Sequence, residues 1–181
     1  SGKEDQKCEK CKQIAERLLG KKKETSEDDF LSKDFGDISI RKLKVEQSLL
    51  PILESRLKEA YLCMQIKASL AVIFLCGSIL EGMLLGVAQQ NIEKFNRSKS
   101  SPKDNNGKVK NLPDWTLNDF INVAYSEGFL GLDIKKFSHS LREFRNYIHP
   151  YQQMVSGFNP DEHTAKICLQ VLKAAIVDLN K

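Results

Sequence analysis

The sequence predicts an all-α fold, an up-and-down bundle of four to five helices. Apolar residues recur at helical spacing in most segments, and capping residues, glycines and prolines separate these segments. Strand-like character is doubtful even in its best stretch, Ile38–Ile40. With 181 residues, 41% of them hydrophobic, the chain can bury the core of one ordinary domain. The net charge of +4 is a weak hint of an anionic partner.

The first part of the chain differs in composition from the rest. Residues 1–40 are predicted to be an extension outside the bundle domain, which we place at residues 41–181. Residues 4–20 form a short amphipathic helix, and residues 21–38 form a charged linker. Residues 8–11 are a lone C-x-x-C motif, but a zinc site needs four ligands and no second pair lies nearby. We therefore expect neither a metal nor a cofactor.

Two long helices are predicted early in the bundle domain, at residues 42–64 and 66–95. Pro51 breaks or kinks the first helix, so two pieces are an alternative. The second helix contains an apolar stretch, residues 68–92, in which Glu81 is the only charge. Its length suits a membrane span, but its glycines, serines and amides favour a buried central helix, so no membrane is expected.

Capping signals predict the next two helices. Thr116 is a plausible N-cap with Asp119 at the third helical position, and this helix closes near Gly128. Asp133 then caps a helix that Pro150 stops. We call this second helix the motif helix.

The last predicted helix opens at the Asn159-Pro160 pair. Its apolar positions include Ile167, Leu169, Leu172, Ile176 and Leu179. Three cysteines, Cys63, Cys76 and Cys168, stand in apolar helical contexts typical of buried free thiols. Such thiols, with a charged N-terminal stretch that lacks an apolar run, predict a cytoplasmic protein.

The loop at residues 96–113 is rich in basic residues. Its cations are Arg97, Lys99, Lys103, Lys108 and Lys110, opposed only by Asp104. A solvated flexible loop is one interpretation, and a loop that contacts RNA phosphates is the other. The four lysines are therefore candidate RNA-binding residues.

The most informative stretch is residues 141–150, Leu-Arg-Glu-Phe-Arg-Asn-Tyr-Ile-His-Pro. On a helix, an apolar stripe forms from Ile134, Phe137, Leu141, Phe144 and Ile148. The opposite side carries Arg142, Arg145, Asn146 and His149. Two cations, an amide and an imidazole then share a face that points away from the core.

This combination suits metal-independent cleavage of RNA. A histidine can move the proton of the 2′-hydroxyl or of the leaving oxygen, because its pKa lies near neutrality. An arginine can hold the scissile phosphate, because its planar fork matches phosphate geometry. The alternative is structural: His149 caps the end of its helix, and both arginines are merely solvated.

Glu81 bears on this choice because it is the sole charge of the central helix and should be partly buried. A buried carboxylate needs a partner, and an arginine of the motif helix is the obvious one. Ser78, Gly82 and Gly86 are spaced by four and form a small-residue stripe beside Glu81 that lets another helix approach closely. A structural ion pair and an orienting role for Glu81 are compatible.

Residues 42–180 resemble the HEPN superfamily (higher eukaryote and prokaryote nucleotide-binding domains). Residues 71–82, Ala-Val-Ile-Phe-Leu-Cys-Gly-Ser-Ile-Leu-Glu-Gly, resemble the central helix of that family, and residues 141–150 resemble its signature helix. The family motif is an arginine, four to six residues and a histidine, which Arg142 and His149 match with six. Only three residues separate Arg145 from His149, which leaves open which of the two arginines has the role of the family's arginine.

The resemblance implies a homodimer whose two signature helices form a shared cleft. Many members are metal-independent endoribonucleases of toxin–antitoxin or antiviral systems, and their cleavage leaves a cyclic phosphate. RNA and an antitoxin or defence-system protein are thus the implied partners, with Arg142, Arg145, Asn146, His149 and Glu81 as site residues. Other members are inactive dimerisation or RNA-binding modules. Some relatives serve nucleotidyltransferases, for which Tyr147 and Tyr151 would be candidate acceptors.

Overall fold

The computed structural model describes residues 29–30, 32–35, 38–146 and 149–181. The predicted helix at 4–20 and the C-x-x-C motif lie outside these residues. Contacts divide the chain into two compact units, Ser1–Ser32 and Lys33–Lys181, and the second unit contains the helical bundle. The boundary predicted between residues 40 and 41 stays a prediction.

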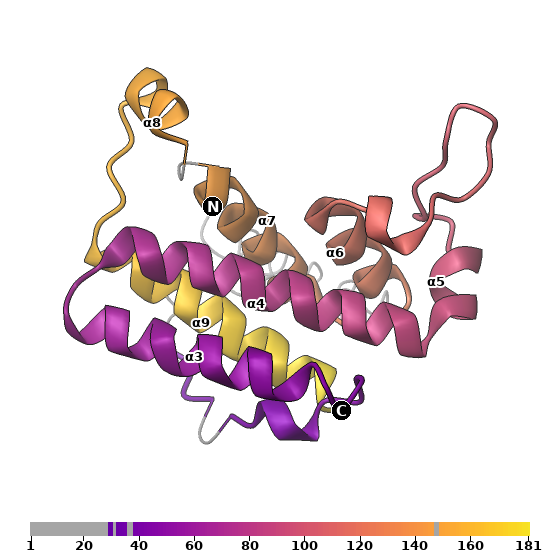
Figure 1. Ribbon diagram of the computed structural model, residues 1–181, viewed down its shortest axis with the longest axis horizontal. Helices are drawn as coiled ribbons and strands as arrows, with labels where there is room; N and C mark the ends of the chain where they lie inside the picture. Colours follow the sequence, from indigo (N-terminus) through magenta and orange to yellow (C-terminus); the bar gives the residue numbers. More distant parts are fainter. Residues whose placement is uncertain (1–28, 31, 36–37, 147–148) are drawn as a thin grey trace, which may run out of the picture. The chain divides into compact units, whose positions relative to one another are not determined.

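Regular structure in the described residues is helical, which confirms the all-α bundle (Figure 1). The elements are η1 (Ile40–Lys42), α3 (Leu50–Gln65), α4 (Ser69–Gln90), α5 (Ile92–Arg97), η2 (Leu112–Asp114), α6 (Leu117–Ser126), α7 (Leu132–Asn146), α8 (Pro150–Ser156) and α9 (Glu162–Leu179). The doubtful strand at Ile38–Ile40 does not form, because the 3₁₀ turn η1 begins at Ile40. An antiparallel bridge joins Lys103 and Val109.

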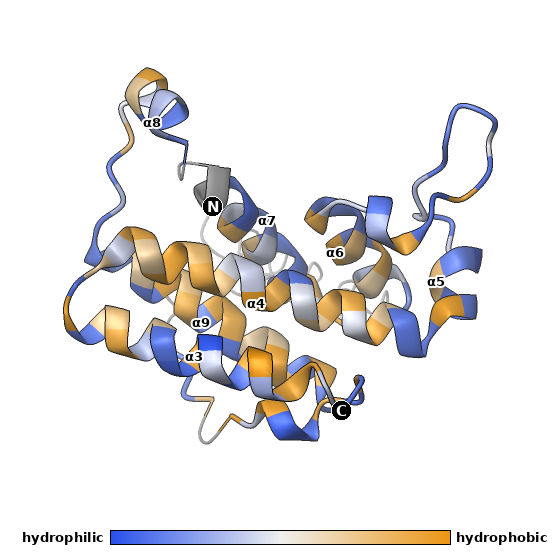
Figure 2. Ribbon diagram, viewed as in Figure 1, coloured by the Kyte–Doolittle hydropathy of each residue, from blue (hydrophilic) through white to orange (hydrophobic). Residues whose placement is uncertain are grey.

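Helix α4 is the centre of the bundle and packs against α3, α6, α7 and α9. Twelve of its 22 residues are buried, and Figure 2 shows it as a mostly apolar ribbon. Among the described helices, α4 is long and apolar enough to cross a membrane. Its burial between four other helices accounts for that composition, as expected for the core helix of a globular domain.

The small-residue stripe of α4 faces α3 and the segment before it. A Cβ atom added to Gly82 would lie 3.1 Å from Leu53 Cδ2, and one added to Gly86 would lie 2.9 Å from Val45 Cγ1. Ser78 accepts a hydrogen bond from Arg56 of α3. The close approach of another helix, predicted from the four-residue spacing, is confirmed.

Two predicted helix boundaries were wrong in the first half of the domain. Helix α3 begins at Leu50, so Pro51 lies in its first turn, where the missing N–H group costs no intrahelical bond. Proline therefore begins this helix and does not break it. The predicted helix at 66–95 is shorter and is followed by α5, because the backbone leaves helical geometry at Asn91 (φ −126°, ψ 35°).

The capping signals of the second half were partly right. Thr116 and Asp119 form the reciprocal capping box of α6, and α6 closes before Gly128, whose φ is +78°. Helix α7 is capped by Gly131, whose carbonyl accepts from Lys135 N, so Asp133 lies in the first turn and is not the cap.

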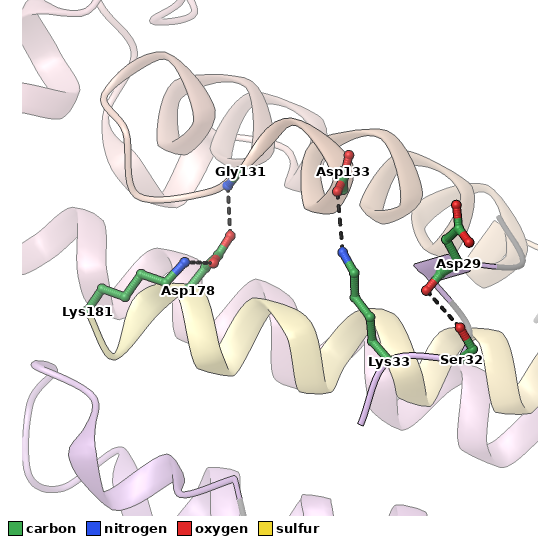
Figure 3. Close-up of polar contacts among 7 residues, drawn as sticks. All are labelled: Asp29, Ser32, Lys33, Gly131, Asp133, Asp178 and Lys181. Carbon is green, nitrogen blue, oxygen red and sulfur yellow. Dashed lines mark hydrogen bonds and ion pairs between the residues drawn. The ribbon is translucent and has the colours of Figure 1, made fainter. Parts of the chain in front are cut away.

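The start of α7 is tied to the end of α9. Gly131 N donates to Asp178 Oδ2 at 2.8 Å, and Lys33 Nζ lies 3.6 Å from Asp133 Oδ2 (Figure 3). Figure 3 also shows Lys181 paired with Asp178 and, in the separate first unit, Ser32 Oγ bonded to Asp29 O. These contacts place α7 against the core before its motif residues begin.

The cap of α9 is Asp161, not Asn159 as predicted. Asp161 Oδ1 accepts from both the backbone N and the hydroxyl of Thr164, each at 2.8 Å. Thr164 supplies two donors three residues after Asp161, so the helix begins there. Of its five predicted apolar positions, Leu169, Leu172 and Ile176 are buried, and Ile167 and Leu179 are half-buried.

Candidate functional site

The predicted motif helix ends earlier than the sequence pattern indicated. Helix α7 stops at Asn146, and His149 has φ −83° and ψ 113° as the N-cap residue of the separate helix α8. The ring of Pro150 disfavours helical geometry at the residue before it, and Pro150 starts α8. The prediction that His149 shares a helical face with Arg142 was therefore wrong.

His149 makes no side-chain cap bond to α8. The structural alternative, in which its imidazole caps carbonyls at the end of α7, stays a prediction. His149 is exposed at the start of a short helix. Its side chain is thus accessible for contact with another molecule.

Helix α7 buries the apolar stripe as predicted for Ile134, Phe137 and Leu141. Arg145 and Asn146 belong to the last turn of α7, but their side chains, like those of Phe144 and Ile148, lie outside the described part. Arg142 and His149 are therefore the motif residues whose surroundings the structure describes.

Arg142 is held in place by the neighbouring helix α6. Its Nη1 donates to Asn118 Oδ1 at 2.7 Å, and its Nη2 lies 3.3 Å from Glu143 Oε1. Its Nε is buried and has no hydrogen-bond partner. The guanidinium is therefore oriented from α6, and an anion can reach Arg142 only through the exposed third of its side chain, which excludes the buried Nε. Asn118 was missed by the sequence analysis, because no local pattern links it to a residue 24 positions away.

Glu81 is half-buried on α4, which packs against α7, so its predicted partial burial is confirmed. It takes part in an interaction within the protein. Its pairing with an arginine of α7 stays a prediction. The orienting contact that the structure does place on Arg142 comes from α6.

His139 is a second site residue that the sequence analysis missed. It lies on α7 one turn before Arg142 and is half-buried. Burial lowers its pKa below the ordinary histidine value, and the positive charges of Arg142 and Lys135 lower it further, partly opposed by Glu143. The three-residue spacing between His139 and Arg142 was the available signal. At neutral pH His139 is a neutral imidazole.

Two further polar residues, Tyr125 on α6 and Lys135 on α7, lie along the contact between these helices. Lys135 Nζ lies 4.5 Å from the centre of the Tyr125 ring, a cation–π geometry. We call the row formed by Asn118, Tyr125, Lys135, His139 and Arg142 the α6–α7 seam. Each of these side chains is half-buried, with part of its surface open to solvent.

The lysine loop is ordered by its own backbone bonds. Asp104 N donates to Lys108 O at 2.8 Å, and Lys110 N donates to Pro102 O at 3.0 Å. The candidate RNA-binding residues Lys99, Lys103, Lys108 and Lys110 are all exposed. Figure 1 places this loop beyond the C-terminal end of α4 and α8 near its N-terminal end. Within one chain the lysines and His149 thus do not form one continuous site.

Apolar side chains are exposed in two places. Tyr151, Met154 and Val155 of α8 are 68%, 69% and 64% exposed, at spacings of three and four residues. Ile66, Leu70 and Phe74 are exposed around the α3–α4 turn. Apolar surface of this kind is typical of contacts with another protein.

The described cysteines are free thiols. Burial raises the pKa of Cys168 to about 12 and that of Cys76 well above its ordinary value, so neither is a nucleophile at neutral pH. Cys63 is half-buried, so its predicted full burial was wrong. Among the described residues, no three His, Cys, Asp or Glu side chains gather into a possible metal site.

No protein-family model, curated protein or solved structure matches this chain. Its function therefore has to be argued from the residues themselves.

Proposed function

We propose that the protein is a metal-independent endoribonuclease of the HEPN type, acting as a homodimer in a toxin or antiviral setting in the cytoplasm. The observation that supports this most is the guanidinium of Arg142, oriented by Asn118 and partly exposed, followed just beyond the end of α7 by the exposed His149. The R-x6-H spacing of the two residues adds the resemblance to the family.

Arg142 binds the scissile phosphate in this proposal and stabilises the charge that develops on it. Arg145 and Asn146 assist, and Glu81 orients an arginine of α7. The 2′-oxygen attacks phosphorus as the bond to the 5′-oxygen breaks, which leaves a cyclic phosphate. A base takes the proton of the 2′-hydroxyl, and an acid protonates the leaving oxygen.

A single neutral imidazole cannot accept one proton and donate another in the same step. The two copies of His149 in a homodimer supply one base and one acid. Their accessible position beyond α7 suits a site shared between subunits. The lysines at residues 99–110 then bind RNA away from the cleaved phosphate.

Cleavage of a mixed RNA in EDTA tests the proposal. We expect the wild-type dimer to leave cyclic phosphate ends and His149→Ala to cleave about 10²–10⁴ times more slowly, the usual contribution of acid–base catalysis. His163→Ala, an exposed histidine on α9, is the matched control and should cleave normally. Light scattering verifies that all three proteins are dimers. Equal cleavage by wild type and His149→Ala, or none by a well-formed wild-type dimer, would contradict the proposal.

The exposed apolar side chains of α8 favour a second candidate, a non-catalytic module that binds an antitoxin or another defence-system protein. This module would dimerise or bind RNA without cleaving it. It predicts that Arg142→Ala and His149→Ala lose assembly or stability while RNA stays intact in every sample. Sedimentation velocity, run beside the cleavage assay, separates the two candidates.

A further inference from the structure

The residues of the α6–α7 seam other than Arg142 lie outside the Arg142–His149 motif, and contacts between the two helices hold the seam in place. Its two ends are set by contacts between the helices, Tyr125 with Lys135 and Asn118 with Arg142. His139 lies one helical turn from both cations of α7 and therefore between these two contacts. The buried residues Ile134, Phe137 and Leu141 face the core, and the seam residues of α7 flank that buried face as a half-buried edge.

The seam is rich in hydrogen-bond donors. Asn118 uses its oxygen to accept from Arg142, which leaves its amide N–H groups to donate. Lys135 meets a ring instead of a carboxylate, and a third of the Arg142 side chain is exposed. The neighbouring carboxylate of Asp119 is occupied by the N–H and hydroxyl of Thr116. Glu143, which is exposed, is the one acid that touches Arg142 in the described contacts.

We propose that the α6–α7 seam binds the phosphate backbone of single-stranded RNA and leads the strand to Arg142. This inference rests on the proposed function, because it extends the same site along α7. Lys135 and Arg142 are seven residues apart, or about 10 Å along a helix, so the two cations can contact two different phosphates of one strand.

His139 makes the binding depend on pH. The charged groups that act on it are Lys135, Arg142 and Glu143, all on α7. Its pKa is lowered, so at neutral pH it contributes a hydrogen bond and no charge. Protonation adds a third cation as the pH falls through that pKa, and the anion binds more tightly. By linkage, a bound phosphate raises the pKa of His139.

Fluorescence anisotropy with a short labelled single-stranded RNA tests the seam on the full-length protein. We expect Lys135→Ala to weaken binding several-fold and to reduce the slope of log affinity against log salt by about 0.7, the loss of one phosphate contact. His139→Gln should reduce the gain in affinity that wild type shows on lowering the pH from about 8 to about 5. Lys58→Ala, an exposed lysine on α3, is the matched control and should bind like wild type.

An NMR titration of the wild-type protein tests the inference without a variant, so it remains informative if a variant does not fold. Inorganic phosphate should raise the pKa of the His139 ring, and a pKa that does not move would overturn the inference. Wild-type affinity and salt slope in folded Lys135→Ala would overturn it as well.

The cleavage assay separates this inference from the proposed function. If His149→Ala loses cleavage while both seam variants bind RNA like wild type, the seam inference is wrong and the ribonuclease proposal holds. If neither wild type nor any variant cleaves RNA but the seam variants bind RNA weakly, the seam inference holds and the ribonuclease proposal fails.

Discussion

The helix pairs α3–α4 and α6–α7 make two different kinds of contact within one bundle, one closely packed and apolar, the other edged by polar groups. Between α3 and α4, Gly82 and Gly86 let apolar side chains approach so closely that an added Cβ atom would nearly collide with them. Between α6 and α7, an apolar floor that includes Phe120 and Leu141 is edged by a row of half-buried polar groups. The first contact has no room for a ligand, and the second leaves donors open.

The energetics of the two contacts differ as well. Burial of apolar surface contributes about 25 cal/mol per Å², and voids or extra atoms in a close-packed interior both cost stability. Polar pairs at a solvent-exposed edge contribute only about 0–1 kcal/mol. Substitutions in α4 should therefore change the free energy of unfolding, whereas substitutions in the seam should change binding.

The largest effect is expected from Leu84→Ala, which removes a fully buried side chain of α4. The lost burial and the resulting cavity should lower the free energy of unfolding by about 2–5 kcal/mol, measured by urea denaturation. Leu62→Ala on α3 removes the same atoms from a side chain that is 53% exposed and should change stability by less than about 0.5 kcal/mol. Equal losses for the two variants would show that α4 is not the core.

A smaller loss of stability is expected from Gly86→Leu, which adds side-chain atoms where no space is free for them. The new side chain meets Val45 and Leu49 and should lower the free energy of unfolding by about 1–3 kcal/mol. Gln89→Leu places the same side chain on the exposed side of α4 and is the control. If Gly86→Leu denatures at the wild-type urea concentration, α3 and α4 are not in the close contact described.

The smallest effect concerns the polar cap of α9 and depends on pH. Hydrogen bonds from Thr164 lower the pKa of Asp161 below its ordinary value, so the carboxylate stabilises the fold above its unfolded pKa. That stabilisation is lost as the pH falls through the folded pKa. Asp161→Asn keeps a capping oxygen without a titrating group. Thermal melts from about pH 6 to about pH 2 should show a higher Tm for wild type than for Asp161→Asn, and this difference in Tm should disappear on acidification. A difference in Tm that stays constant with pH would contradict the prediction.

Local patterns in the sequence determined much of the fold. The capping box of Thr116 and Asp119, the helix end before Gly128 and the burial of α4 all follow from residues within one or two turns of each other. The His149-Pro150 pair also held a local signal, since the residue before a proline avoids helical geometry. Helical periodicity across that pair was the weaker guide.

Only the tertiary structure decided which helices meet. Periodicity tells which face of a helix is buried but not which partner covers it. The pairing of Arg142 with Asn118 joins residues 24 positions apart, and the contact of Gly86 with Val45 spans a helix and a turn. Such contacts depend on how whole helices pack, so the seam beside Arg142 became visible only once α6 and α7 were placed side by side.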